Sequence, residues 1–196
     1  MNKRVITIII VVVAVFLVYN FFTSKYNSMV TLDEDVNTEW ANVETQYQRR
    51  YDLIPNLVNT VKGFADQERE VLTQVTEARS KASSIQIDPS NLNEQSLQQF
   101  AQAQSQLNGA LSRLLVTVER YPDLKSNQNF LDLQAQLEGT ENRISVARTR
   151  FNEKARNYNV YIRKFPNSMI AGMFDFERKP LYEADQEAEN APKVEF

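Results

Sequence analysis

The residues best suited to chemistry in this sequence gather in the stretch RRYDLIPNLV. Arg49 and Arg50 carry guanidinium groups, which bind carboxylates and phosphates through paired N–H donors, and Asp52 follows two positions later. Pro55 and Asn56 complete the group. These residues could form a ligand site at one end of a helical domain. They could equally complement two helix ends, since arginine suits a helix C-terminus and aspartate an N-terminus. We favour the structural interpretation.

Pro55 decides how the helices around it are divided. A proline inside a helix loses a hydrogen bond and clashes with the preceding turn, at a cost of ~3 kcal/mol. At the first position of a helix it costs almost nothing. We therefore predict a chain reversal, with a first helix over residues 27–51 and a second opening at Pro55. The alternative is one helix kinked at Pro55, because Tyr47, Ile54 and Val61 keep helical phase through it.

Polar residues also interrupt the apolar stripes, namely Glu68, Gln104, Thr140, Glu141 and Arg148. In a helical bundle they could form a buried polar layer that fixes register, with Arg148 answering a carboxylate, or they could be boundary residues. Inward-facing carboxylates also occur in di-iron bundles, but those sites need histidines and this chain has no His. We predict no metal and no cofactor, and we regard these residues as structural or partner-binding candidates.

Several classes of function are disfavoured by composition. With no Cys and no His, the chain cannot form a disulfide, a thiol nucleophile or a typical zinc site. The net charge is −3 and no basic stripe is present, which argues against nucleic-acid binding. The sequence also lacks a nucleophile–base pair and a glycine-rich phosphate loop. We expect no catalytic residues and no enzymatic activity.

An all-α fold is expected, because 4 Gly and 6 Pro are too few for the turns of a sandwich or doubly wound fold. Apolar residues recur every three or four positions, as on one face of a helix, in four series. The series are Met29, Leu32, Val36, Trp40, Val43 and Tyr47; Leu57, Val61, Phe64, Val71, Val75, Ala78 and Ala82; Leu97, Phe100, Leu107, Leu111, Leu114, Val118 and Tyr121; and Phe130, Leu133, Leu137, Ile144, Phe151, Tyr158, Ile162 and Phe165. The third resembles a coiled-coil heptad pattern, and Pro122 and Pro166 end the last two helices. We predict an antiparallel up-down four-helix bundle; the alternative is three long helices, the first kinked at Pro55.

A membrane segment precedes this body. Residues 5–22 are almost entirely apolar and would span roughly 27 Å as a helix, close to the ~30 Å hydrocarbon thickness. Bulky residues follow the apolar core in place of a small-residue cleavage site, which indicates an uncleaved signal anchor. Residues 1–4 form a short flank whose Lys3 and Arg4 favour a cytoplasmic N-terminus, with the body outside the cytoplasm. The bilayer is thus one expected partner.

The body is expected to span residues 27–166, followed by a C-terminal extension over residues 167–196 that ends in an acidic tail. The start of this extension is apolar, with Met169, Ile170, Met173 and Phe174 close together. These side chains could pack over the side of the bundle. Alternatively they could form an exposed patch that docks a partner or the bilayer surface.

The combined motifs resemble the LemA family of bacterial membrane proteins. The resemblance rests on EWANVETQYQRRYDLIPNLVNTVKGFADQE at 39–68, ERYPDLKSNQNFLDLQAQLEGTENRISVARTRFNEKARNYN at 119–159, RKFPNSMIAG at 163–172 and the ending APKVEF. It implies a helical-bundle domain behind one N-terminal transmembrane helix, with no established biochemical activity. Relatives are associated with magnetosome membrane formation, which implies a membrane-organising role. Leu181 departs from the family pattern, which would place a second aromatic residue beside Tyr182.

Two functions follow from these observations. The first is a non-enzymatic, single-pass membrane scaffold of the bacterial cell membrane, which self-associates or recruits membrane-protein partners in membrane or envelope organisation. The second is a binding or sensing module that regulates a membrane-bound partner such as a protease. It would act through the patch at 165–176 or through the end of the bundle at Arg49–Asp52.

Overall fold

The computed structural model describes residues 2–64, 67–89 and 92–182. Helices and their connections account for all of this described part, and no strand occurs in it, so the all-α prediction is confirmed. The helices are α1 (Lys3–Lys62), α2 (Arg69–Ser84), α3 (Glu94–Val118), α4 (Pro122–Lys125), α5 (Gln128–Arg163) and α6 (Asn167–Met173).

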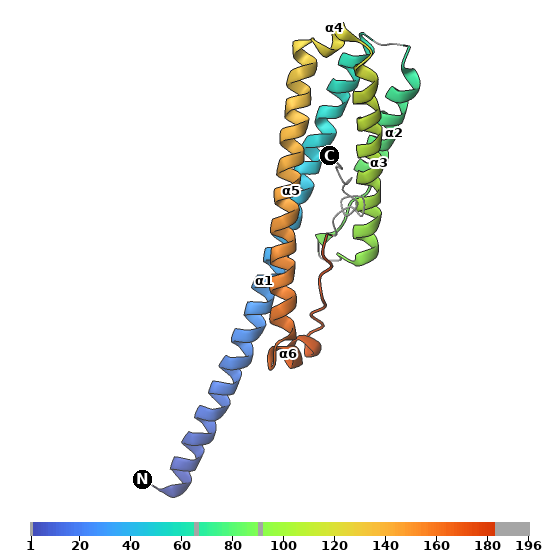
Figure 1. Ribbon diagram of the computed structural model, residues 1–196. Coiled ribbons are helices and arrows are strands. Elements are labelled where there is room, and N and C mark those ends of the chain that lie inside the picture. The colour runs from blue at the N-terminus through green and yellow to red at the C-terminus, as the bar shows by residue number, and fades with distance from the viewer. Residues whose placement is uncertain (1, 65–66, 90–91, 183–196) are drawn as a thin grey trace, which may run out of the picture.

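Helix α1 joins the apolar N-terminal segment to the body without interruption. Its 60 residues correspond to about 90 Å of helix. Residues 5–22 are exposed on every side, and the lower part of α1 projects alone from the rest of the molecule (Figure 1). This is the one helix in the described residues that is long and apolar enough to cross a membrane. The structure is therefore compatible with a single-pass membrane protein.

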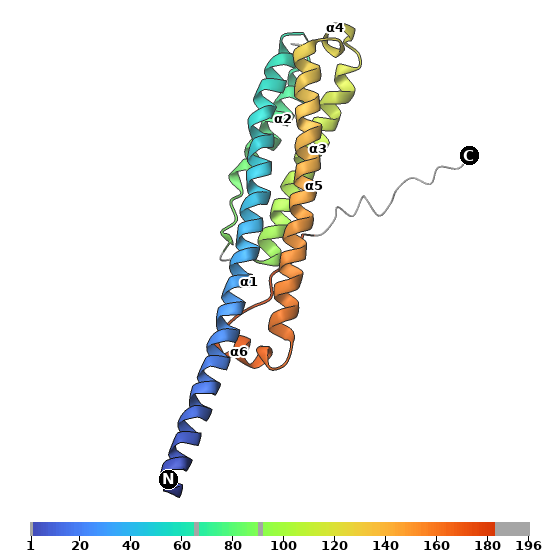
Figure 2. The ribbon, with the colours of Figure 1, turned by 90° about the vertical axis from the view of Figure 1, so that its left-hand side faces the viewer.

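Four long helical segments lie side by side in the body: the upper half of α1, then α2, α3 and α5 (Figure 2). The chain alternates in direction between them, and α5 packs along α1 over the longest stretch. The short α4 lies at the distal end, whereas α6 lies beside α1 where that helix leaves the body.

The core follows the apolar stripes expected from the sequence. Trp40 is completely buried and makes edge-to-face contacts with Phe100 of α3 and Phe151 of α5, whose ring centroids lie 5.5 and 5.3 Å away. Phe64 and Phe165 are exceptions, because both lie just beyond a helix end and remain exposed. The periodicity therefore identifies the buried faces correctly but overruns the helix ends.

The predicted break at Pro55 is wrong. Pro55 lies inside α1, which continues to Lys62, and the chain reverses only between α1 and α2. The first part of the predicted second helix thus belongs to α1, and its remainder is α2 alone.

Two features explain why the helix tolerates this proline. Around Pro55, the side chains of Tyr51, Ile54 and Leu57 are buried on one face, and each such burial contributes about 1.5–3 kcal/mol. Their sum outweighs the ~3 kcal/mol cost of an interior proline. The carbonyl of Tyr51, four residues before Pro55, would lack its helical donor. Arg79 of α2 supplies one, because its Nε–H donates to this oxygen at 2.7 Å.

A C-terminal strap, residues 174–182, runs back from α6 along the body. Two asparagines of α5 hold it through their side-chain amides, which pair with both backbone groups of one strap residue each. Asn152 pairs with Tyr182 at 2.7 and 2.8 Å, and Asn159 pairs with Lys179 at 2.9 and 2.8 Å. Lys179 also forms an ion pair with Asp33 of α1 at 2.9 Å. The acidic residues predicted to follow, 183–196, lie outside the described part.

Candidate functional site

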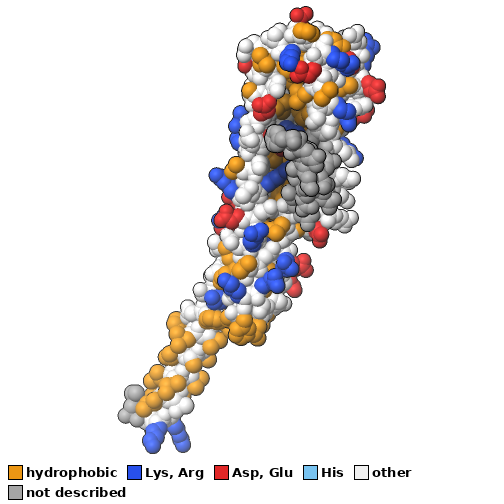
Figure 3. All heavy atoms as spheres, in the orientation of Figure 1, with side chains coloured by type: hydrophobic (Ala, Val, Ile, Leu, Met, Phe, Trp, Pro, Cys, Tyr) orange, Lys and Arg blue, Asp and Glu red, His pale blue; other side chains and the backbone are white. Residues whose placement is uncertain are grey.

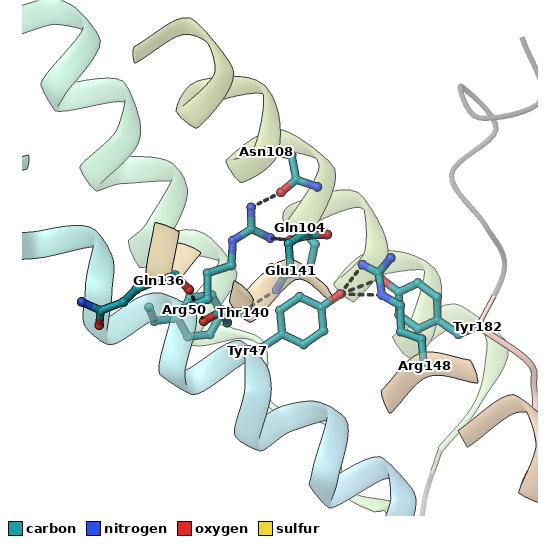
Figure 4. Close-up of polar contacts among 10 residues, drawn as sticks. Tyr47, Arg50, Gln104, Asn108, Gln136, Thr140, Glu141, Arg148 and Tyr182 are labelled. Carbon is teal, nitrogen blue, oxygen red and sulfur yellow. Dashed lines mark hydrogen bonds and ion pairs between the residues drawn. The ribbon is translucent and has the colours of Figure 1, made fainter. Parts of the chain in front are cut away.

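A network of polar side chains crosses the middle of the body and centres on Tyr47 of α1 (Figure 4). The Tyr47 hydroxyl oxygen accepts hydrogen bonds from Nε and Nη2 of Arg148 on α5, the former at 2.9 Å. It also lies 3.3 Å from the hydroxyl of Tyr182 on the strap. The Arg148 guanidinium stacks over the Tyr182 ring, 4.2 Å from its centroid. Arg148 therefore contacts two tyrosines and not the carboxylate expected from the sequence.

Arg50 forms the second part of the network. Its side chain is buried and donates to Asn108 of α3, while Nη1 lies 3.3 Å from the Glu141 carboxylate of α5 (Figure 4). Burial lowers the pKa of Arg50 from its ordinary value, and the nearby Glu141 carboxylate opposes this effect. Glu141 therefore forms an ion pair between helices, as a residue of a polar layer would. Its partner is Arg50 and not Arg148.

Tyr51 extends the network to two further helices. Gln104 of α3 donates its amide N–H to the Tyr51 hydroxyl, which in turn donates to the carbonyl of Ala82 at 3.2 Å in the last turn of α2. Tyr47, Arg50 and Tyr51 therefore connect α1 to α2, α3, α5 and the strap. We call these three residues and the partners described above the central polar network.

The two tyrosines of this network are hydrogen-bonding groups at neutral pH. Burial raises the pKa of Tyr47 well above its ordinary value of 10. Burial also raises the pKa of Tyr51, to about 12. Both phenols are therefore neutral at pH 7 and act as hydrogen-bonding groups. A network of this kind suits a role in fixing how the helices align.

The stretch that first suggested a ligand site does not form one cluster. Arg50 points into the core, whereas Arg49, Asp52 and Asn56 are exposed. Asp52 accepts a hydrogen bond from Gln48 Nε2 on the preceding turn, at 2.9 Å. The two arginines therefore do not converge on a common point.

Glu68 lies apart from the central polar network, at the distal end of the body. Its carboxylate accepts hydrogen bonds from Arg120 at 3.0 Å and from the Tyr121 hydroxyl at 2.9 Å, so it ties the turn before α2 to the turn after α3. The five polar residues that interrupt the stripes thus occupy at least two separate places.

Two open grooves indent the described surface. The larger, about 1200 Å³, lies between α3 and the strap, and its lining combines neutral amides such as Gln95 and Gln98 with charged side chains such as Glu94 and Arg178. The smaller, about 420 Å³, lies between α1 and α5 around Val146 and Arg150. Neutral amides suit hydrogen bonding to a polar partner. No group of three or more acidic or metal-ligating side chains in the described residues could hold a metal ion.

The apolar residues after α5 divide into two sets. Ile170 is buried against the body, whereas Met169, Met173 and Phe174 are exposed. The exposed set belongs to the lower end of the body, where Figure 3 shows hydrophobic atoms gathered beside α1. Packing and exposure, which the sequence offered as alternatives, are therefore both present within one short helix.

Sequence reasoning missed the residues that hold the strap. Asn152 and Asn159 lie seven positions apart and so share one face of α5, a spacing that could have indicated a common function. Tyr47 gave no signal of its own, because a tyrosine in an apolar stripe is normally interpreted as core, and Tyr182 lies in the C-terminal extension outside the apolar stripes. Arg79 carried no signal either, since its partner is a backbone carbonyl on another helix.

Comparison with known proteins gives a consistent set of relatives. The sequence matches the LemA family over residues 39–196. It is 25% identical over 178 residues to "Magnetosome protein MamQ 2" of Paramagnetospirillum magneticum, covering 81% of this chain and 65% of that protein. It is 26% identical over 173 residues to "Magnetosome protein MamQ" of Magnetospirillum gryphiswaldense, covering 79% and 63%. "Protein LemA" of Metamycoplasma hominis is 21% identical over 168 residues, covering 86% and 73%. The chain thus spans just under two thirds of the MamQ proteins.

Proposed function

Because the chain belongs to the LemA family, we propose that it is a non-enzymatic, membrane-anchored helical scaffold that assembles with copies of itself or with other membrane proteins. Residues 5–22 cross the bacterial cell membrane once as an uncleaved signal anchor. The body lies outside the cytoplasm as an up-down four-helix bundle over residues 27–166. Its role is in membrane or envelope organisation.

The observation that carries this proposal is the continuity of α1. One helix presents exposed apolar side chains at residues 5–22 and then buries Val36, Trp40 and Val43 in the core of the body. No flexible linker separates the anchor from the bundle, so the bundle is held at a fixed height and direction above the bilayer. A rigid presentation of this kind suits a protein whose surface is recognised by others.

The character of the polar groups supports a non-enzymatic role. Arg50, Glu141 and Arg148 are engaged in contacts between helices, and burial raises the pKa of Tyr47, which Arg148 contacts. The larger groove offers amide groups among its lining residues. The relatives named magnetosome proteins support an association with a membrane structure.

The test is self-association of the full chain in its membrane. The sequence contains no cysteine, so a single Val160→Cys substitution places one thiol on the exposed side of α5 without a background thiol. We expect oxidation of membranes carrying this variant to give a disulfide-linked dimer or bonds to one recurrent membrane protein. Proximity labelling of the unmodified chain should identify the same neighbour. A chain that stays monomeric in membranes and in mild detergent, with no recurrent neighbour, would refute the scaffold.

A second function, a sensor that regulates a membrane-bound partner such as a protease, is favoured by one observation. The central polar network lies on the same helix as the anchor, so displacement of the anchor must strain every helix that contacts α1. Insertion of Gly-Gly-Ser after Thr23 would uncouple the two parts. A scaffold would retain its neighbours after this insertion, whereas a sensor would keep the partner but lose control of its activity.

A further inference from the structure

Four large apolar side chains are exposed together at the lower end of the body. We call Phe165, Met169, Met173 and Phe174 the membrane foot. Their exposed fractions are 82%, 65%, 66% and 50%. Contiguous apolar surface of this kind marks a site that another apolar phase covers.

Helix α6 has one buried face and one exposed face. Ile170 and Ala171 are buried, with exposed fractions of 1% and 5%, and they attach the helix to the body. Met169 and Met173 are one helical turn apart and point away from that attachment. The body therefore already has its contact with α6, and the outward face is left for another partner.

The position of the membrane foot along α1, relative to the apolar segment 5–22, indicates that this partner is the bilayer. The ring of Tyr26 contacts Phe174 and Phe176, with centroids 4.9 and 5.6 Å apart, and Lys25 Nζ lies over the Tyr161 ring at 5.8 Å. Tyr26 is four residues beyond the apolar segment 5–22, which is about 6 Å along the helix. The headgroup layer of a bilayer is itself roughly 5–8 Å thick on each side. The foot therefore lies at the level where α1 leaves the hydrocarbon.

The residues around the foot also fit a bilayer surface. Lys25 is partly exposed, and Arg163 and Lys164 are exposed at the end of α5, immediately before Phe165. Figure 3 shows basic side chains directly above the hydrophobic atoms at this end of the body. Basic groups above an apolar, aromatic surface are the arrangement of interfacial segments, in which the apolar side chains enter the headgroup–acyl boundary. Asp175 offsets part of this positive charge, and the four exposed apolar side chains supply the contact with the acyl region.

We propose that the membrane foot inserts into the headgroup–acyl boundary of the same bilayer that residues 5–22 cross. The body is then attached at two points, α1 and α6, and this second contact fixes its tilt relative to the membrane. The foot requires insertion of α1 but not self-association, so this inference and the scaffold can fail independently.

The test measures how deeply each position lies in a membrane. Single-cysteine variants Met169→Cys and Met173→Cys of the full chain are spin-labelled and reconstituted into vesicles of phosphatidylcholine, with and without phosphatidylglycerol. Val116→Cys is the matched control, since Val116 is 71% exposed and lies near the distal end of α3. Collision with a water-soluble nickel complex is compared with collision with oxygen, which concentrates in the bilayer.

We expect the labels at 169 and 173 to be at least several-fold less accessible to nickel than the label at 116, and more accessible to oxygen, in both lipid mixtures. This shielding should persist as protein is diluted with lipid. Shielding that disappears on dilution would identify a second copy of the chain as the occupant and overturn the proposal. Equal nickel accessibility at all three positions would overturn it as well. A Phe165→Cys label should respond like the other foot positions, and it should lose its shielding in a Met169→Glu, Met173→Glu background.

Discussion

Pro55 and Arg79 should contribute to stability as a pair, although they lie on different helices. Pro55 has no N–H, so the Tyr51 carbonyl has no helical donor and accepts instead from Arg79 Nε at 2.7 Å. Arg79 therefore offsets part of the cost of an interior proline. If this is correct, substitutions at the two positions will not be additive.

The expected magnitudes follow from the groups involved. Pro55→Ala restores the N–H and removes the steric clash, and should stabilise the fold by about 1–3 kcal/mol. Arg79→Met in the native background leaves the Tyr51 carbonyl without a donor and should cost about 1.5–3 kcal/mol. In the Pro55→Ala background the carbonyl regains its helical donor, so Arg79→Met should cost less than about 1 kcal/mol. The coupling free energy between the two sites should then be about 1–2 kcal/mol.

The assay is urea unfolding of the full chain in detergent micelles, followed by tryptophan fluorescence. Trp40 is the only tryptophan and is completely buried, so its emission reports on the core of the body alone. Arg113→Met, on the exposed side of α3, is the control and should combine additively with Pro55→Ala. A cycle between positions 55 and 79 that is additive within about 0.3–0.5 kcal/mol would refute the compensation. So would destabilisation by Pro55→Ala.

Three further predictions concern the strap, the core and pH. Asn159→Ala should raise hydrogen exchange of the strap amides about 10- to 100-fold, because it removes both hydrogen bonds that hold one strap residue, whereas Asn157→Ala on the exposed side of α5 should change nothing. Protection that is the same in both variants would show that the strap is held in another way. Glu141→Ala should destabilise the fold by about 1–3 kcal/mol in urea titrations, because it leaves the buried Arg50 guanidinium without its carboxylate. Arg50→Met should destabilise the fold by less, because the half-exposed Glu141 carboxylate that remains can be solvated by water. The opposite order would contradict this reasoning. Burial raises the pKa of Glu44, although its contacts with the Trp40 indole and the Ile87 backbone oppose this effect. The folded state therefore binds this proton more tightly than the unfolded chain does. It loses stability as the pH rises from the pKa of Glu44 in the unfolded chain to its pKa in the folded protein. Glu44→Gln should therefore raise the urea midpoint at pH 7 and have little effect below about pH 3, where the carboxyl group is protonated in both states. A constant difference across this range would exclude the carboxyl group as the cause.

The buried faces could be predicted from the sequence because burial follows a period that the chain displays directly. The stripe from Met29 to Tyr47 and the heptads around Leu107 become core residues as expected. The helix ends were harder, since Phe64 and Phe165 continue the apolar spacing past the last hydrogen-bonded turn. Periodicity carries no information about where backbone hydrogen bonding stops.

The residues around Pro55 could not by themselves show whether the helix ends or continues there. A proline has the same intrinsic cost wherever it lies inside a helix, but here a donor on α2, 28 residues after the carbonyl it serves, replaces the missing N–H. The same limit applies to Arg148 and Arg50. From the sequence, Arg148 is expected to meet a carboxylate in a polar layer, and Arg50 to complement a helix end or bind a ligand. Which of the two meets Glu141 and which meets Tyr47 depends on how α5 is aligned with α1. Partner choice between helices is a three-dimensional property.

Helix α1 therefore acts as the common reference for the whole body. Tyr47, Arg50 and Tyr51 occupy little more than one turn of this helix, and their partners lie on α2, α3, α5 and the strap. A register shift of any one helix against α1 would separate at least one buried polar group from its partner, which costs about 1–3 kcal/mol for each neutral group. Apolar stripes alone tolerate such shifts better, because one leucine can replace another in the same groove. The central polar network thus selects one alignment of the helices, and because α1 also carries the apolar segment 5–22, it fixes that alignment relative to this segment.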